Sequence, residues 1–267
     1  MAGLAAAALT APMLSAHQLT VARPGTPGPP LVADLEFAVQ PGQLMAVLGC
    51  NGAGKTLTLH TLAGLRAPAA GEVRLDGRPL PRWAPRERAR HLGLLAQVEE
   101  EAFPATVLEC ALAGRHPHLG FWDWEGESDE WAARDALQAC DLGGLEHREI
   151  HTLSGGERRR AQLATVLAQD PRVLLLDEPL NHLDPRHQRQ LLQLLRSRVD
   201  AGDCVISTLH DAGIAARYAD VALLLYGDGQ WDFGPAAEVL EAGRLSELYG
   251  VPLRAHRVDG HLVFLED

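Results

Sequence analysis

The chain has 267 residues, of which 46% are hydrophobic, and it carries a formal net charge of −11. This length suits one large α/β domain or two small ones. The negative charge argues against a general nucleic-acid-binding protein, because such proteins usually present a basic face. It does not argue against nucleotide binding, since a phosphate site depends on local hydrogen-bond donors rather than on overall charge.

The first residues are rich in alanine, and no Lys or Arg precedes Arg23. The positively charged start of a secretory signal is therefore missing. We predict a weakly ordered extension over residues 1–12 and a single domain over residues 13–267. Apolar runs stay shorter than the roughly 18 residues of a membrane span. The cysteines show neither metal-binding nor redox spacing, which predicts reduced thiols in the cytosol.

The chain begins with β structure. Residues 15–22 and 31–39 are typical of two strands, and a turn rich in proline and glycine joins them. A Pro-Gly turn then precedes the apolar run 44–48, which predicts a buried strand. Residues 57–63 can follow as a helix.

A phosphate-binding loop lies between that strand and that helix. It fits the pattern G-x-x-x-x-G-K-[ST] in the strand–loop–helix context that the pattern needs. Glycines let successive backbone N–H groups turn toward phosphate oxygens, and the helix N-terminus adds positive potential. We expect Lys55 to reach the β- and γ-phosphates of ATP and the Thr56 hydroxyl to bind Mg²⁺. The predicted ATP-binding residues of the loop are Gly49, Cys50, Asn51, Gly52, Ala53, Gly54, Lys55 and Thr56.

The middle of the chain changes from strands to helices. We expect a short strand, a basic helix and a buried strand at 71–77, 83–90 and 92–96. The last of these strands ends at Gln97. From about residue 98 to 155 the composition favours helices, and Trp131, Leu137 and Cys140 recur with helical spacing. We predict an inserted helical subdomain there.

The second half alternates helices with apolar strands. We expect a helix at 158–168, a strand at 173–176, a helix at 185–199 and a strand at 204–208. Short strands, helices and a terminal hairpin follow, with the C-terminal segment at about 226–267. This alternation predicts an α/β fold with a mostly parallel sheet and helices on both faces.

Polar side chains follow three of the predicted strands. Asp177 and Glu178 on their own would be a solvated turn, but ligands collect at the carboxyl ends of parallel strands, and a phosphate loop lies upstream. We predict that Asp177 and Gln97 hold Mg²⁺, and that Glu178 is the general base for the attacking water. Gln97 and His210 complete the predicted catalytic set, with His210 at the γ-phosphate.

The segment Leu153-Ser154-Gly155-Gly156-Glu157 resembles the signature motif of the ATP-binding cassette (ABC) superfamily. The motif order is also similar to that family: phosphate loop, glutamine loop, signature, carboxylate strand, Leu183-Asp184 loop and switch histidine. The resemblance runs from Gly49 to His210. It implies an α/β P-loop cassette with a mixed sheet core, an N-terminal antiparallel β-subdomain and an inserted α-helical subdomain.

The resemblance implies a homodimer, because cassettes of this family pair head to tail and enclose two ATP molecules. Ser154, Gly155 and Gly156 would then bind the γ-phosphate of the ATP held by the other subunit. Three positions depart from the family pattern, namely Arg23, Cys50 and Leu180, the last of which replaces a common threonine. Arg23 stands where many members stack an aromatic ring on adenine, although an Arg plane can also stack on a base. Cys50 replaces a common proline and makes the loop sensitive to thiol reagents if it is exposed.

Three further segments resemble the ATPase subunits of iron–siderophore, haem and cobalamin importers. They are Gly114–His118, Asp177–Gln188 and Leu248–Pro252. The resemblance implies ATP hydrolysis that drives import through a separate integral membrane permease, at the cytoplasmic face of the membrane. A substrate-binding protein would take part indirectly, and nucleic acid would not. The ATPase of a lipid or drug exporter and a non-transport scaffold of the iron–sulfur assembly type are the alternatives.

An aromatic stretch in the predicted helical subdomain has two interpretations. Phe121, Trp122 and Trp124 are either anchors for the permease or ordinary packing of the subdomain. His116 and His118 have no third ligand nearby, so we expect structural or interface roles for them rather than metal binding.

Overall fold

The computed structural model describes residues 12–25, 28–97, 104–120 and 122–267. The predicted extension lies outside these ranges except for Pro12, and so does Phe121. Within the ranges given, no helix has both the length and the apolar character that a membrane crossing requires.

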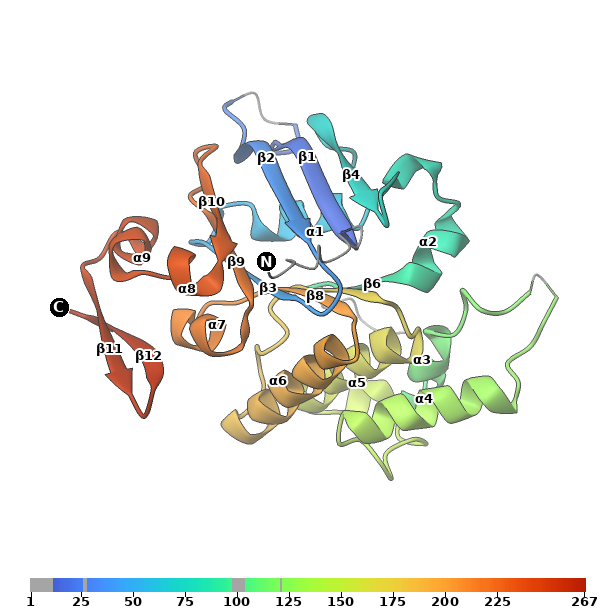
Figure 1. The fold of residues 1–267 in the computed structure, drawn as a ribbon. Coiled ribbons are helices and arrows are strands. Elements are labelled where there is room, and N and C mark those ends of the chain that lie inside the picture. Colours follow the sequence, from blue (N-terminus) through green and yellow to red (C-terminus); the bar gives the residue numbers. More distant parts are fainter. Residues whose placement is uncertain (1–11, 26–27, 98–103, 121) are drawn as a thin grey trace, which may run out of the picture.

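Two main sheets and a hairpin contain the strands of the described chain (Figure 1). The antiparallel sheet has the order β2-β1-β4-β5, formed by Val32–Val39, Leu14–Val21, Ala70–Leu75 and Arg78–Pro79. The central sheet has the order β10-β9-β3-β8-β7-β6, formed by Trp231–Pro235, Val221–Leu225, Leu44–Leu48, Cys204–Thr208, Val173–Leu176 and Leu92–Leu95. The hairpin pairs β11 (Leu253–Val258) with β12 (His261–Glu266).

Helices connect these strands and cover the central sheet. The first half contributes α1 (Lys55–Leu62), α2 (Pro85–His91), α3 (Val107–Ala113), α4 (Glu127–Ala139) and α5 (Gly155–Ala168), with short 3₁₀ turns at Leu80–Arg82 and Ile150–Thr152. The second half contributes α6 (Pro185–Asp200), α7 (Ala212–Tyr218), α8 (Ala236–Val239) and α9 (Ala242–Tyr249). In Figure 1, α1 lies between the two main sheets, while α5 and α6 lie on the other side of the central sheet.

The central strands are apolar along their whole length because both faces of the sheet are covered. Val47 and Leu175 pack in the cluster that contains α1 and the antiparallel sheet. Leu174 and Val205 point to the opposite face and pack with α5 and α6. Leu224 packs with α7, α8 and α9. Successive side chains of a strand point to opposite faces of the sheet, and here both faces are buried.

The strand order positions the candidate site. Strands β3, β8, β7 and β6 are parallel neighbours, so their carboxyl ends lie along one edge of the sheet. The segments that follow these ends contain Lys55, His210, Glu178 and Gln97, respectively. Four residues that are far apart in the sequence therefore meet at one edge.

Three details of the structure were not predicted from the sequence. Trp131 lies on α4 but is 70% exposed, so the spacing that included it did not mark the buried face. That face consists of Ala133, Ala136 and Leu137, because small residues let α4 approach its neighbours closely. Trp122 and Trp124 are 86% and 88% exposed, which excludes ordinary core packing for both. Helix α7 was not predicted, and it begins directly after His210 with Asp211 as its N-cap.

We expect Leu175→Ala to lower the free energy of unfolding by about 2–5 kcal/mol, because Leu175 is fully buried in β7 and its loss leaves a cavity. Urea denaturation followed by circular dichroism measures this change. Leu65→Ala is the matched control: Leu65 is 63% exposed, and its loss should change the free energy by no more than about 0.5 kcal/mol. Equal effects of the two substitutions would contradict the assignment of β7 to the core.

Candidate nucleotide-binding site

The phosphate loop connects β3 to α1 as the sequence predicts. Lys55 is 5% exposed, and its Nζ donates to the carbonyl oxygens of Gly49 at 2.7 Å and Cys50 at 3.2 Å. Burial lowers the pKa of Lys55, while Glu178 and Asp177 oppose this change. Glycine is required at position 49, since a Cβ there would lie 2.6 Å from the Leu225 carbonyl oxygen. The backbone is thus curled around the ammonium group that phosphates would attract.

Asp177 lies at the end of β7 with no exposed surface. Its Oδ1 accepts a hydrogen bond from Thr208 Oγ1 at 2.8 Å, but its Oδ2 has no hydrogen-bond partner among the described residues. A buried carboxylate oxygen without a partner is costly, and a cation would satisfy it. The residues therefore fit Mg²⁺, which commonly binds one or two carboxylates together with substrate phosphates and water.

A Mg²⁺ ion bound together with a nucleotide needs few protein ligands, because phosphate and water oxygens supply the others. Within the described ranges, no group of three or more His, Cys, Asp and Glu side chains could hold a metal ion by itself. Thr56 and Gln97, the other predicted Mg²⁺ ligands, line the same cavity as Glu178. The chain places its polar groups around a space in which phosphate oxygens would supply the remaining ligands.

Glu178 is held by partners from three elements. His210 Nε2 lies 2.8 Å from Oε1, while Gln97 Nε2 and Asn181 Nδ2 donate to Oε2 at 2.9 and 2.6 Å. The Glu178 backbone has a φ of 48°, in the left-handed region, and its N–H donates to Thr208 Oγ1 at 2.7 Å. The side chain of Glu178 is only 10% exposed. Its carboxylate is therefore oriented before any substrate arrives.

Sequence reasoning missed Arg159, which connects α5 to this edge of the sheet. The Arg159 side chain donates to the carbonyl oxygens of Ala96 at 2.8 Å and Glu178 at 3.1 Å, and also to that of Asp177. Arg159 is 7% exposed. Nothing in the sequence indicated this role of Arg159, because its hydrogen-bond partners follow β6 and β7, which are far from it in the chain.

The candidate nucleotide cavity has a volume of about 760 Å³. Arg23, Lys55 and Thr56 line one part of it, and Glu178 and His210 line another. Other lining residues include Asn51, Gly52, Gly54, Gln97 and Asn181. The structure thus brings together the predicted adenine contact, much of the phosphate loop and the predicted catalytic side chains.

Of the predicted signature residues, Gly155 lines a second cavity rather than the first. This neighbouring cavity, of about 460 Å³, is lined by Gly155 together with Thr56, Gln97 and Glu178. Ser154 caps α5: its Oγ accepts from the Glu157 backbone N–H at 3.3 Å, and Glu157 accepts from the Ser154 N–H at 2.8 Å. Since the Ser154 hydroxyl acts as an acceptor there, its own proton is left for another acceptor.

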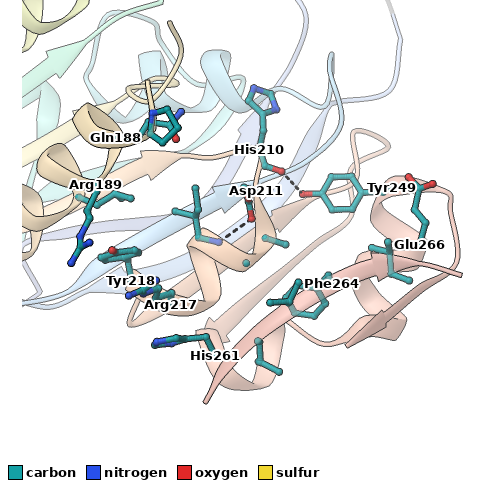
Figure 2. A pocket seen from close by; sticks show the side chains of 18 of the residues that line it. Gln188, Arg189, His210, Asp211, Arg217, Tyr218, Tyr249, His261, Phe264 and Glu266 are labelled. Atoms are coloured by element: carbon teal, nitrogen blue, oxygen red, sulfur yellow. Dashed lines mark hydrogen bonds between the residues drawn. The ribbon is translucent and has the colours of Figure 1, made fainter. Parts of the chain in front are cut away.

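A larger groove lies beside α7 and the C-terminal hairpin (Figure 2). It has a volume of about 1010 Å³ and extends from His210 along α7 to the hairpin, where Phe264 and Glu266 lie. Tyr249 donates to the His210 carbonyl oxygen at 3.4 Å. None of the described phosphate-loop residues lines this groove. The 760 Å³ cavity, which the phosphate loop lines, is therefore the candidate nucleotide site.

Comparison with known proteins assigns a family to this constellation. Residues 32–181 match the family described as ABC transporter. The chain is similar to two proteins named hemin import ATP-binding protein HmuV. The protein from Pseudomonas entomophila (strain L48) is 41% identical over 238 residues, covering 86% of this chain and 92% of the relative. The protein from Nocardia farcinica (strain IFM 10152) is 43% identical over 252 residues, covering 92% of this chain and 86% of the relative.

Solved structures show the same fold. A transporter described as of the metal-chelate ABC type, in an inward-facing conformation, has a TM-score of 0.81 and 27% identity, covering 95% of this chain and 98% of the other. A dimeric bacterial ABC transporter cassette has a TM-score of 0.74 and 24% identity, covering 84% of this chain and 99% of the other. The predicted cassette fold is thereby confirmed.

Cys50 generates a prediction because it is exposed and its thiol donates to the Leu248 carbonyl oxygen at 3.1 Å. Burial raises the pKa of Cys140 to about 12 and also raises the pKa values of Cys110 and Cys204, which keeps these thiols in their unreactive protonated form. We expect N-ethylmaleimide to label Cys50 first. Mg-ATP at about ten times its Kd should slow this labelling about ten-fold, since about a tenth of the sites stay empty.

Mass spectrometry of the labelled peptides measures the order of modification. Cys50→Ala is the control and should remove the fast phase. Labelling of Cys50 that ignores Mg-ATP would contradict the placement of the nucleotide against this loop.

Proposed function

This chain belongs to the ABC transporter family, and we propose that it is the ATPase subunit that powers import of haem through a separate membrane permease. The observation that carries the proposal is the identity of 41% and 43%, over most of the chain, to proteins named for hemin import. Iron–siderophores and cobalamin are related cargoes that the test below must separate from haem. In this proposal the chain associates peripherally with the cytoplasmic face of the membrane.

The chain hydrolyses ATP and uses Mg²⁺, as its family does. Asp177, Thr56 and Gln97 would hold Mg²⁺. When bound, Mg²⁺ would neutralise the charge that develops on the β- and γ-phosphates. The unpartnered Oδ2 of Asp177 supports this assignment. Lys55 Nζ would exchange its two loop carbonyl oxygens for phosphate oxygens, because an anion is the stronger partner for an ammonium group.

Glu178 is the general base of the proposed mechanism. It would accept a proton from the water that attacks the γ-phosphorus, while the bond to the β-phosphate oxygen breaks. Both Glu178 oxygens have protein partners in the structure, so water reaches one of them when Gln97 or His210 turns toward the nucleotide. In this proposal Gln97 and His210 sense the γ-phosphate and release the base.

The proposed active unit is a homodimer. The resemblance of Leu153–Glu157 to the family's signature motif supports a segment that serves another chain's nucleotide. Ser154 to Gly156 would then stabilise the γ-phosphate held by the partner. The similar dimeric cassette supports this arrangement through its fold. Closure and reopening of the dimer would drive the permease, to which a substrate-binding protein delivers cargo.

We expect Glu178→Gln to lower kcat for ATP at least about 100-fold, because the amide cannot accept the proton of the attacking water. The Kd for ATP should stay within about two-fold of the wild-type value, since the phosphate loop is unchanged. A phosphate-release assay and equilibrium dialysis measure the two quantities. The variant should also elute as a dimer with Mg-ATP and as a monomer without it. Glu238→Gln, at an exposed position of α8, is the control and should behave as the wild type. Turnover by Glu178→Gln at the wild-type rate would disprove the assignment of Glu178 as the general base.

Uptake by cells tests the cargo. Deletion of the gene should abolish uptake of radiolabelled haem, while uptake of a ferric siderophore and of cobalamin continues. The wild-type gene should restore haem uptake, and the Glu178→Gln gene should not, because transport depends on hydrolysis. Loss of siderophore or cobalamin uptake with intact haem uptake would assign a different cargo, and no change in any uptake would argue for the scaffold alternative.

A further inference from the structure

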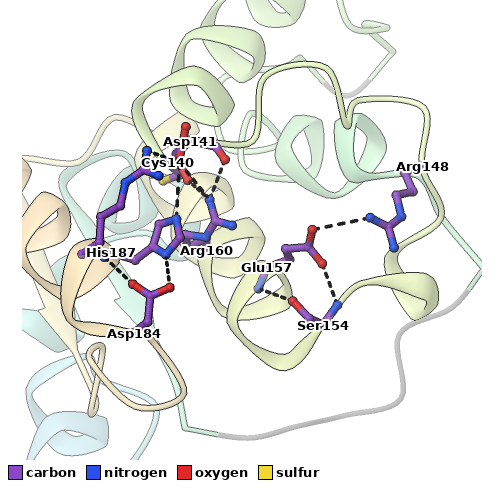
Figure 3. A network of polar contacts seen from close by, with 9 residues as sticks. Cys140, Asp141, Arg148, Ser154, Glu157, Arg160, Asp184 and His187 are labelled. Atoms are coloured by element: carbon purple, nitrogen blue, oxygen red, sulfur yellow. Dashed lines mark hydrogen bonds and ion pairs between the residues drawn. The ribbon is translucent and has the colours of Figure 1, made fainter.

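Asp141 connects the helical part of the chain to the first turn of α6 (Figure 3). Its carboxylate lies 3.3 Å from His187 Nε2 and 3.6 Å from Arg186 Nη2, both on α6. Arg160 of α5 donates to the Asp141 carbonyl oxygen at 2.5 Å and lies 3.9 Å from its carboxylate. A single residue just beyond α4 therefore contacts cationic side chains on two other helices.

His187 extends this contact to the loop before α6. Its Nδ1 lies 2.8 Å from Asp184 Oδ2, and its backbone N–H donates to Asp184 Oδ1 at 3.0 Å. The hydrogen bonds from His187 hold the pKa of Asp184 below its usual value. The side chains of His187 and Arg160 are 19% and 13% exposed, whereas that of Asp141 is 52% exposed, so one partner of each pair is held in place by packing and the other faces solvent.

The contacts of Asp141 with Arg160 on one side and His187 on the other form a bridge between α5 and α6. Each end of this bridge belongs to a segment with a proposed role. Helix α5 starts at the signature segment, and the box between Ser154 and Glu157 fixes its first turn. Asp184 ends the 181–184 segment, whose Asn181 donates to the proposed base Glu178 at 2.6 Å. The two segments also touch directly, since a Cβ on Gly156 would lie 2.9 Å from the His182 carbonyl oxygen. That close contact can keep its geometry only if both helices are fixed relative to each other.

We propose that Asp141 is a positioning residue for ATP hydrolysis, which sets the signature segment against the 181–184 segment through Arg160 and His187. The inference rests on the proposed function, since it concerns the dimeric ATPase. The signature segment serves the partner's ATP, whereas the 181–184 segment adjoins the chain's own Glu178. The bridge therefore links the two ATP sites of the dimer. His187 lies in the importer-like stretch Asp177–Gln188 and does not line the candidate nucleotide cavity. The bridge gives this side chain a positioning function.

Asp141→Asn tests the proposal with little disturbance of the backbone. Asp141 has a φ of 55°, in the left-handed region that Asn also adopts, so the substitution removes charge and keeps conformation. We expect kcat to fall about five- to ten-fold, because small misplacements of catalytic groups are costly. KM and the Kd for ATP should stay within about two-fold of the wild-type values, since the phosphate loop is untouched.

His187→Gln should lower kcat to a similar extent. Asp141→Asn removes the charge that faces His187, and it leaves the hydrogen bond from Arg160 to the backbone carbonyl oxygen of residue 141 in place. The double variant, with Asp141→Asn and His187→Gln, should be no slower than either single variant, because each substitution already removes the charge-assisted contact between these two side chains. Asp170→Asn is the matched control: Asp170 also has a left-handed backbone, with a φ of 52°, and contacts Arg198 away from the site. Its kcat should equal that of the wild type.

Hydrogen exchange gives a readout that a merely stabilising network would not reproduce. In Asp141→Asn, the backbone amides of residues 154–157 and 181–184 should exchange about five-fold faster, while those of β3 and β7 should not change, because only the link between the two segments is lost. Exchange that rises equally in all four places would mean a general loss of stability and would overturn the proposal.

Two kinetic results would also overturn it. One is a kcat of Asp141→Asn equal to that of an active wild-type protein. The other is a double variant whose loss is the product of the two single losses, which would mean independent roles. If the wild-type chain itself does not hydrolyse ATP, the proposed function fails first, and this inference fails with it.

Discussion

The end of β7 is the point on which the proposed ATPase site depends. Asp177 is completely buried there, and Thr208 of the neighbouring strand satisfies one of its oxygens while also accepting the backbone N–H of Glu178. A single hydroxyl thus ties together two strands and two carboxylates. The remaining Asp177 oxygen has no described partner, so the site carries an electrostatic cost that Mg²⁺ would relieve.

Helix α5 links this strand end to the rest of the cassette through three consecutive arginines. Arg158 reaches the Leu153 carbonyl oxygen at 3.5 Å, within the signature segment. Arg159 donates to the backbone of the carboxylate strand, and Arg160 donates to the backbone at Cys140 and Asp141. Guanidinium groups suit this task because each has several donors in a fixed plane and keeps its charge when buried. The same helix therefore connects the proposed base, the signature and the helical subdomain.

The local chemistry of the site was accessible from the sequence. The phosphate loop, Asp177, Glu178, Gln97 and His210 were predicted from motifs and strand ends, and the structure places them along one edge of the sheet. Arg159 and Thr208 were missed, because their partners are 18 to 63 and 30 to 31 positions away, respectively. The spacing of Trp131 predicted a helix but not the exposure of its ring, since hydrophobic spacing cannot tell a large exposed ring from a buried one when alanines form the packed face.

The sequence by itself determined the kinds of elements and the chemistry of the loop, because phosphate binding needs specific residues at short, fixed spacings. It determined the family as well, through motifs that occur in a fixed order. Only the tertiary structure decided which strand ends are neighbours, how Glu178 is held by Gln97, Asn181 and His210, and that Asp141 meets His187. These are contacts between segments far apart in the chain. No local pattern encodes them, since strand order and helix packing are set by the burial of the whole core.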